Sequence, residues 1–163
     1  MKTITIEQAL KMGWCYDEER LRKIAGEKQE WSALDILNLP GIPDNDKLYT
    51  VLNVELIDEP ILHEFACRCA ERALSKIENP DPRSVAAIAA KRAWIKGEIT
   101  DDDLYAARKA AWYAAWDAAW EAARDAAWGA ARGAARYAAL VAAWGAECQW
   151  QVDELKRMLE AGK

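Results

Sequence analysis

Histidine is almost absent from this sequence, which contains His63 alone. A single histidine removes most zinc and iron sites, and every Ser–His or Cys–His arrangement that needs a second histidine. Cys67 and Cys69 lie two residues apart on a predicted helix, about 200° apart in projection, so they cannot bind one metal ion together. The sequence also has no Gly-rich phosphate loop, no H-E-x-x-H motif and no nucleophile elbow. We therefore expect a protein that is not an enzyme and that uses no metal or cofactor.

Long apolar runs are missing too. The longest is far shorter than the ~20 residues that span a bilayer, and the first residues, MKTITIEQAL, have no signal-peptide core. The four cysteines, Cys15, Cys67, Cys69 and Cys148, do not form the dense framework of a secreted protein. These features favour a soluble, cytoplasmic protein with reduced thiols and no membrane partner.

An excess of basic residues is also lacking. The net charge of −5 divides into −5 over residues 1–60, +2 over 61–100 and −2 over 101–163. This distribution is not typical of a nucleic-acid-binding protein, so we expect no nucleic acid as partner. One local exception is the stretch between Asp125 and Glu147, which has no acidic residue but contains arginines and aromatic residues.

Residues typical of strands are sparse, whereas helix signals follow one another along the chain. Caps and breakers predict helices over 5–12, with Thr5 as N-cap, and over 18–25, between Asp17 and Gly26. A Ser32/Asp35 capping box predicts a helix over 33–38, and another helix is predicted from Asp44 or Asp46 through Leu48, Val51, Leu52 and Leu56. A longer helix is predicted from Asp58 to Glu78, with a buried stripe that includes Cys69 and Ile77. The helix after it is predicted over 83–96. Thr100 and the three aspartates after it open the last helical segment. We predict one all-α domain over residues 1–163, a compact multi-helix bundle with short helices over 1–99 and a long Ala-rich segment over 100–160.

The segment from Trp112 to Trp144 places a large residue at every fourth position, with two alanines before each. Alanine has the best helix propensity, so a helix is expected here. Four residues advance a helix by about 400°, so the stripe of large residues drifts by about 40° per repeat. Since no face stays apolar, we expect this helix to be bent or broken and enclosed by other helices, with most of its tryptophans buried. Gly129, Gly133 and Gly145 are candidate breaks, although the first two also form a G-x-x-x-G notch suited to close helix contact within or between chains.

Arginines occupy the same stripe as the tryptophans. An unpaired buried charge is costly, so these arginines need either internal carboxylates or a bound anion as partners. Aromatic faces and guanidinium groups together suit a planar anion, on which rings stack and arginines donate to phosphates. Arg83, in the N-P-D-P-R-S loop, is a second possible phosphate contact. The candidate ligand-binding residues are Arg83, Trp112, Trp116, Arg124, Trp128, Arg132, Arg136 and Tyr137.

Several motifs carry a resemblance to a known family. They are L-Y-T-V-L-N-V-E-L-I-D at 48–58, F-A-C-R-C-A-E-R-A-L at 65–74, N-P-D-P-R-S-V-A-A-I at 79–88 and R-A-W-I-K-G-E-I-T-D-D-D-L-Y-A-A-R at 92–108, followed by the Ala-rich repeats. Over about two-thirds of its length the chain resembles the immunity-protein-5-like family of small Ala/Trp-rich helical proteins of bacteria and phages. The resemblance implies an all-helical fold and no known catalytic residues. We expect the protein to act in the cytoplasm of a bacterial or infected host cell.

Two functions are compatible with these patterns. The first is sequestration of a small anionic, nucleotide-derived immune signal by a phage-type anti-defence protein, for which the Trp/Tyr/Arg stripe is the motivation. The second is an immunity protein that binds and blocks a protein toxin through the acidic N-terminal third. A homo-oligomer is compatible with either function.

Overall fold

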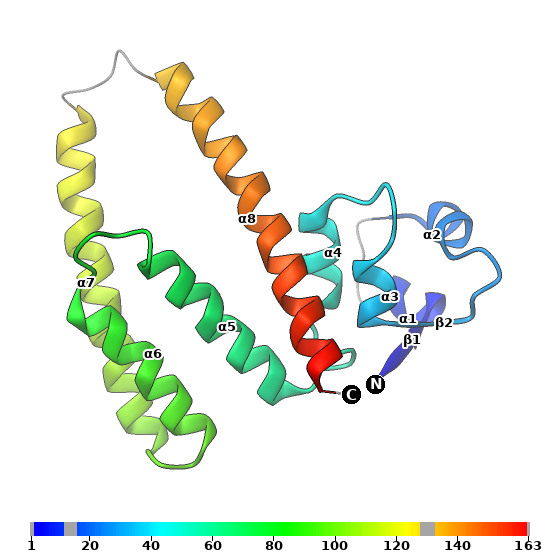
Figure 1. The fold of residues 1–163 in the computed structure, drawn as a ribbon, viewed down its shortest axis with the longest axis horizontal. Helices are drawn as coiled ribbons and strands as arrows, with labels where there is room; N and C mark the ends of the chain where they lie inside the picture. The colour runs from blue at the N-terminus through cyan, green and yellow to red at the C-terminus, as the bar shows by residue number, and fades with distance from the viewer. Residues whose placement is uncertain (1, 12–15, 128–132, 163) are drawn as a thin grey trace. The chain divides into compact units, whose positions relative to one another are not determined.

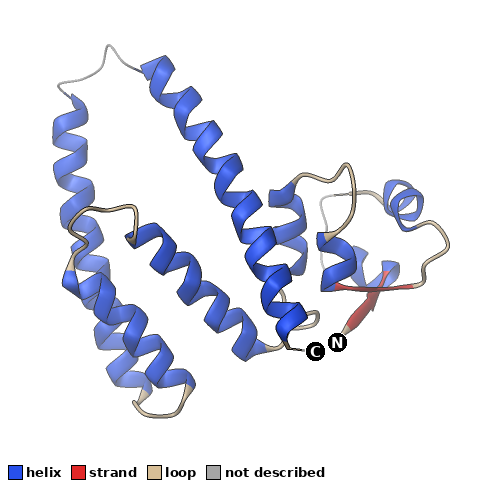
Figure 2. Cartoon of the chain, viewed as in Figure 1, coloured by secondary structure: helices blue, strands red, loops and turns tan. Residues whose placement is uncertain are grey.

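A computed structural model describes residues 2–11, 16–127 and 133–162, and the side chains within 118–142 are not among those described. Helices make up nearly all of its regular structure, so the protein is all-α, as predicted (Figure 2). The chain divides into two compact units. The terminal unit contains residues 1–62 and 143–163, and the central unit contains residues 63–142. The prediction of a single domain stays a prediction.

Two short strands form a small sheet in the terminal unit. β1 (Thr3–Thr5) pairs antiparallel with β2 (Glu30–Ser32), and Ile4 lies opposite Trp31. Neither strand was predicted, because three residues are too few for an alternating pattern to be recognised. The helix predicted over 5–12 is α1 (Ile6–Lys11), which begins directly after β1 (Figure 1).

Local caps set the helix ends of the terminal unit where the sequence predicts them. Thr5 and Gln8 exchange hydrogen bonds at the start of α1. Asp17 accepts from the backbone N–H of Arg20 to begin α2 (Glu18–Ala25), which ends at Gly26 with φ of 59°. Ser32 and Asp35 form a capping box on α3 (Ala33–Leu37). Capping side chains satisfy N–H groups that the first helical turn leaves without partners, so these positions are readable from sequence.

The core of the terminal unit is built from aliphatic side chains of several helices. α4 (Asp44–Val51) is shorter than predicted and buries Leu48 and Val51, while Leu52 is exposed. Leu56 is buried although it follows the helix. α8 (Gly133–Ala161) contributes a fixed stripe at i, i+4, i+7 and i+11, formed by Cys148, Val152, Leu155 and Leu159. This stationary stripe is typical of a helix that packs one face against a core.

The described part of the central unit contains most of α5, all of α6 and α7, and residues 133–142 of α8. α5 (Glu59–Leu74) enters it at His63 and ends four residues before the predicted end, so Ile77 is exposed. α6 (Pro82–Ile95) begins behind Asp81, with Pro82 in its first turn. α7 (Asp101–Ala127) follows a turn at Gly97 and begins with a capping box between Thr100 and Asp103. α6 and α7 are antiparallel and lie side by side (Figure 1).

The tryptophan ladder behaves differently from the prediction. Trp112 and Trp116 are 58% and 59% exposed, and Trp144 of α8 is 68% exposed, so the prediction that they are buried was wrong. On α7 the buried positions are Leu104 and Ala114. Small residues allow the closest approach of two helices, so the alanine side of α7 faces α6 and the tryptophans point outward. α7 ends at Ala127 and α8 begins at Gly133, and the predicted break at Gly129 lies outside the described residues.

Few side chains of the central unit are buried. Among its described residues, only Phe65, Cys67, Leu104 and Ala114 belong to the core, and Cys69, predicted to lie on the buried stripe, is half-buried. The terminal unit buries a much longer series of Leu, Ile and Val residues. The central unit therefore has a thin core built largely from alanine. In the described part of the chain, no helix is both long and apolar enough to cross a bilayer.

Candidate ligand-binding groove in the central unit

A groove of about 470 Å³ runs between α5, α6 and α7. This volume is within the range of small-molecule sites. Its lining is apolar apart from Ser84, two cations and the thiol of Cys67, and consists of Ala66, Cys67, Ala70, Ala73, Leu74, Ser84, Ala87, Ile88, Lys91, Leu104, Arg108 and Ala111. Alanine leaves space between helices where larger side chains would interlock. The groove is thus a direct consequence of the alanine content of these helices.

An arginine clamp joins α5 to α6 beside the groove. Arg92 of α6 donates from Nε to Oε2 of Glu64 at 3.0 Å and from Nη2 to Oε1 of Glu64 at 3.0 Å. It also donates from Nη2 to Oε2 of Glu71 at 2.9 Å and from Nη1 to Oε1 of Glu71. Arg68 adds a hydrogen bond to Glu64 at 3.1 Å. The bonds from Arg92 tie α5 to α6.

The clamp shifts the pKa values of its members. Hydrogen bonds from Arg92 lower the pKa of Glu64 and also the pKa of Glu71. The two carboxylates raise the pKa of Arg92 in return. All three groups therefore stay charged at neutral pH, and α5 remains attached to α6.

Two cations line the groove, with no carboxylate among the lining residues. Lys91 of α6 is half-buried, with its Nζ 3.8 Å from the centre of the Trp94 ring, and Arg108 of α7 is exposed. Contacts between Arg83 and Asp117 at 3.3 Å and between Trp94 and Asp101 at 2.6 Å set the antiparallel register of α6 and α7. This register places Lys91 and Arg108 at a similar level along the groove. Neither forms an ion pair within the part of the chain that the structure describes.

Cys67 is a buried residue in the lining of the groove. It is 4% exposed, and no hydrogen-bond partner of its sulfur is found among the described residues. Burial raises the pKa of this thiol, so it is protonated at neutral pH. Cys67 thus contributes a weakly polar surface rather than a thiolate nucleophile.

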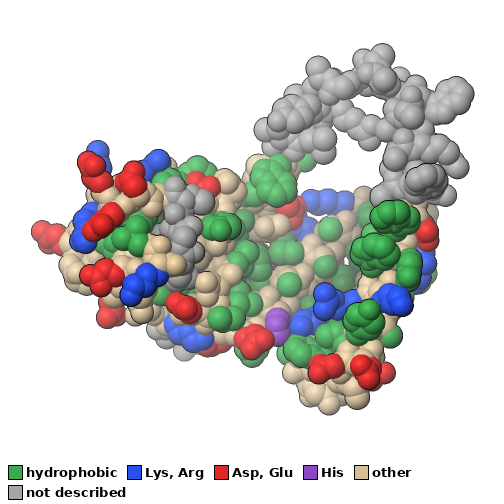
Figure 3. Space-filling view, turned by 180° about the vertical axis from the view of Figure 1, so that it is seen from behind, with side chains coloured by type: hydrophobic (Ala, Val, Ile, Leu, Met, Phe, Trp, Pro, Cys, Tyr) green, Lys and Arg blue, Asp and Glu red, His purple; other side chains and the backbone are tan. Residues whose placement is uncertain are grey.

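The outer face of α7 carries a row of aromatic and basic side chains next to the groove. Trp112 contacts Trp116 and Tyr113, with ring centroids 5.5 and 5.3 Å apart. Tyr105 is 66% exposed on the same side, at the i−3 position of Arg108. Figure 3 shows large hydrophobic side chains beside Lys and Arg side chains on one face of the molecule. We name Tyr105, Arg108, Lys109, Trp112 and Trp116 the aromatic face of α7.

The predicted ligand-binding residues have three different outcomes. Arg83 is in contact with carboxylates, since it donates to Asp81 at 2.8 Å and to Asp117 at 3.3 Å, and its predicted role as a phosphate contact stays a prediction. Trp112 and Trp116 are exposed on α7 and do not line the groove. Trp128 and Arg132, together with the side chains of Arg124, Arg136 and Tyr137, lie outside the described residues, so their predicted role stays a prediction.

Sequence reasoning missed Lys91 and Arg108. Both stand outside the repeat of large residues, and each has a neighbour of like charge, Arg92 and Lys109. A signal was available, because Lys91 follows Ser84, Ala87 and Ile88 on one helical face, and Arg108 follows Leu104. A cation that ends an apolar helical stripe is the pattern that could have identified them.

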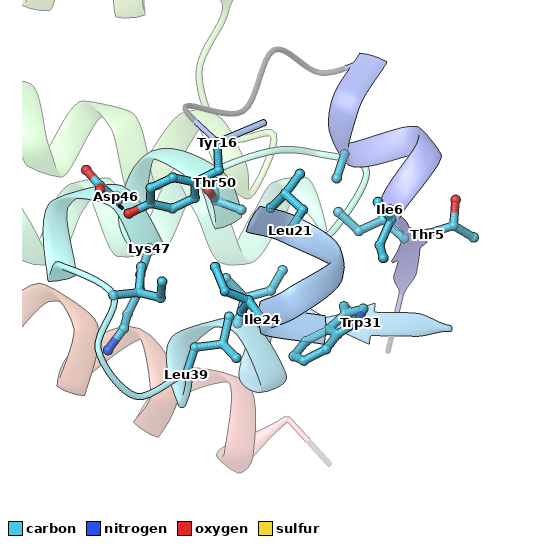
Figure 4. A pocket seen from close by; sticks show the side chains of 14 residues that line it. Thr5, Ile6, Tyr16, Leu21, Ile24, Trp31, Leu39, Asp46, Lys47 and Thr50 are labelled. Carbon is cyan, nitrogen blue, oxygen red and sulfur yellow. Dashed lines mark hydrogen bonds between the residues drawn. The ribbon is translucent and has the colours of Figure 1, made fainter. Parts of the chain in front are cut away.

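A second cavity lies in the terminal unit and is much smaller, at about 40 Å³ (Figure 4). Leu21, Ile24, Trp31 and Leu39 are among its lining residues, and the Tyr16 hydroxyl donates to Asp46 at 2.6 Å. A water molecule needs at least ~10–15 Å³, so this cavity has room for only a few atoms. Across the described residues, no group of His, Cys, Asp and Glu is arranged to hold a metal ion.

No model of a known protein family, no characterised protein and no solved structure matches this chain. The resemblance to the immunity-protein-5-like family therefore stays a prediction.

Proposed function

We propose that this chain is a non-catalytic binding protein that sequesters a small organic anion in the groove between α5, α6 and α7. The observation that carries the proposal is the pairing of an apolar groove of ligand size with two cations, Lys91 and Arg108. Ligand pockets typically combine an apolar lining with a few polar groups that orient the ligand.

The other arginines around the groove support this assignment by contrast. Arg83 and Arg92 each contact two carboxylates, and Arg68 contacts Glu64. Lys91 and Arg108 line the groove without a carboxylate near them in the lining. An anion that enters the groove finds charge-assisted donors that no acid among the described residues occupies, and such hydrogen bonds are about twice as strong as neutral ones.

The biological setting of this activity comes from the sequence. A phage-type anti-defence protein that traps a nucleotide-derived immune signal in the cytoplasm would need a site for a small anion and no catalytic group. The groove supplies such a site, although on residues other than the arginines of the Trp/Arg repeat. A nucleotide-derived ligand is therefore one class of the small organic anions that the proposal covers, and it is tested below against other anions.

Isothermal titration tests the proposal with a panel that contains cyclic nucleotides, ADP-ribose-type nucleotides and simple organic carboxylates. We expect at least one panel member to bind wild-type protein, and its affinity to fall at least tenfold in a Lys91→Gln/Arg108→Gln variant. The matched control is Arg22→Gln/Lys23→Gln on α2, which removes two exposed cations of the terminal unit and should leave binding unchanged. A bound ligand at 100 times its dissociation constant should also add ~2.7 kcal/mol to stability. No binding across the panel would refute the proposal.

A second function, that of an immunity protein which binds a protein toxin, is favoured by the aromatic face of α7. Tyr, Trp and Arg are the residues most enriched at energetic centres of protein interfaces, and Tyr105, Trp112 and Trp116 are all more than half exposed. The test is co-expression with a candidate toxin. Protection that is lost in Trp112→Ser/Trp116→Ser but kept in Lys91→Gln, which leaves the aromatic face of α7 intact, would favour the toxin function over sequestration.

A further inference from the structure

We propose that the anion held in the groove is a free medium-chain carboxylate, with its alkyl chain along the alanine-lined floor and its carboxylate at Lys91 and Arg108. This inference rests on the proposed function and specifies the class of ligand.

The lining of the groove favours an alkyl chain over a nucleobase. Between the two cations and Ser84, the floor is formed by side chains such as Ala70, Ala87 and Ile88. A nucleobase would bury its ring nitrogens and exocyclic groups there with one hydroxyl and one thiol as partners, and buried polar groups without hydrogen bonds are strongly disfavoured. An alkyl chain has no such groups, so every atom of it matches the floor.

The length of the floor limits the length of the chain. Ser84 and Lys91 are seven residues apart on α6, which corresponds to ~10 Å at 1.5 Å per residue. A fully extended carbon chain advances ~3.8 Å over three bonds, about the distance between consecutive Cα atoms across a trans peptide. About eight to nine bonds therefore fill the distance from the cations to Ser84, which corresponds to a chain of nine or ten carbons such as decanoate.

The positive charges of Lys91 and Arg108, which lie at a similar level of the groove, orient the ligand. The Arg108 guanidinium can donate two parallel hydrogen bonds to a carboxylate, and the Lys91 ammonium keeps its N–H donors while it lies over the Trp94 ring. The remaining lining, which is apolar up to Ser84, has no second cation for a second anionic group. A ligand with one carboxylate at one end and an apolar body matches this asymmetry, whereas a ligand with phosphates at both ends does not.

The decisive experiment is isothermal titration of the full chain with hexanoate, octanoate, decanoate and dodecanoate, each below the concentration at which it forms micelles. Each added CH₂ should raise affinity about fourfold up to decanoate, and dodecanoate should gain little more. Decanol, which lacks the charge, should bind at least tenfold more weakly than decanoate. Decanoate affinity should fall at least tenfold in Lys91→Gln/Arg108→Gln.

Two alanine variants show whether the groove itself is the site. Ala70→Leu fills the floor and should abolish decanoate binding, whereas Ala86→Leu, an exposed position of α6 outside the lining, should leave it unchanged. Equal retention of binding in both variants would overturn the inference, because the alkyl chain would then lie elsewhere. Circular dichroism of both variants confirms that the helices are intact, and the Lys91→Gln/Arg108→Gln result serves as the independent check if Ala70→Leu fails to fold.

The remaining outcomes separate this inference from the proposed function. Binding of a nucleotide at Lys91 and Arg108 without binding of any carboxylate overturns the inference and leaves the proposed function standing. Absence of any ligand overturns both. The last measurement tests binding to vesicles of anionic phospholipid. Binding to vesicles without binding to free decanoate would identify a lipid surface as the ligand and overturn the inference.

Discussion

The arginine clamp between α5 and α6 makes a quantitative prediction for Arg92→Met. The substitution keeps the apolar stem of the side chain but removes the hydrogen bonds to Glu64 and Glu71. The Arg92 side chain is 33% exposed, and those of Glu64 and Glu71 are 33% and 47% exposed. Solvent-exposed ion pairs contribute ~0.2–1 kcal/mol each, while well-shielded hydrogen bonds to charged groups reach ~1.5–3 kcal/mol. Because the pairs of Arg92 with Glu64 and with Glu71 are both partly exposed, we expect Arg92→Met to lower the free energy of unfolding by about 1–2 kcal/mol.

The same clamp predicts how this loss depends on pH. The folded-state pKa of Glu64 is lowered from its ordinary value of 4.5, and that of Glu71 is lowered likewise. A carboxyl with a lowered pKa stabilises the fold above its unfolded pKa, and this contribution disappears as the pH falls through the lowered folded value. The difference between wild type and Arg92→Met should therefore be full at pH 7 and shrink as the pH falls below about 4.5.

Thermal unfolding and hydrogen exchange of the α5 amides measure these effects. Each kcal/mol corresponds to ~2–4 °C for a protein of this size, and exchange in α5 should accelerate because the helix opens more readily. The control is Arg22→Met, which removes an exposed pair with Glu18 whose side chains are 59% and 56% exposed and should change stability by less than ~0.5 kcal/mol. The stabilising role of the clamp would be refuted if Arg92→Met lost no more stability than the control. It would also be refuted if the loss of stability at pH 3 were as large as at pH 7.

Predictions for four further substitutions concern stability. Burial alone would raise the pKa of Asp35, but hydrogen bonds from Lys28 and Ser32 outweigh it and lower the pKa to about 2. Urea unfolding should therefore show wild type more stable than Asp35→Asn by about 1 kcal/mol at pH 6, allowing for solvent screening, with the difference falling as the pH approaches 2. Gly97→Ala should cost ~1–2 kcal/mol, because φ is 73° there, whereas Gly145→Ala, inside α8 with open space around it, should gain ~0.5–1 kcal/mol. Leu155→Ala, which empties a fully buried site, should cost ~2–5 kcal/mol by chemical denaturation.

Much of the fold could be predicted from the sequence because helix boundaries depend on local chemistry. Asp17, the Ser32/Asp35 box and Thr100 act on N–H groups within a few residues of themselves, so their effect does not depend on the rest of the chain. The paired strands β1 and β2 are different. They are separated by 24 residues of chain and are stabilised by each other, so neither has a local signature.

The candidate site was the least predictable part. A large residue repeated every fourth position suggested that tryptophans form the core, but packing of α6 on α7 uses alanine and leaves Trp112 and Trp116 outside. Which side of an Ala-rich helix is buried depends on its neighbours, since both sides are nearly equal in apolar content. Lys91 and Arg108 could not be predicted for a similar reason. They line a groove only because a third helix, α5, lies beside α6 and α7.

The most direct test of the central claim, that a small anion binds between α5, α6 and α7, is an amide and methyl NMR titration of the full chain with decanoate and with ADP-ribose. We predict that at least one of the two ligands causes shift changes that cluster at lining positions such as Ala70, Ala87 and Ile88, and that these changes are absent in Lys91→Gln/Arg108→Gln. Shift changes that cluster instead around the terminal-unit cavity at Leu21 and Ile24, or the absence of shift changes with both ligands at saturating concentrations, would contradict the account.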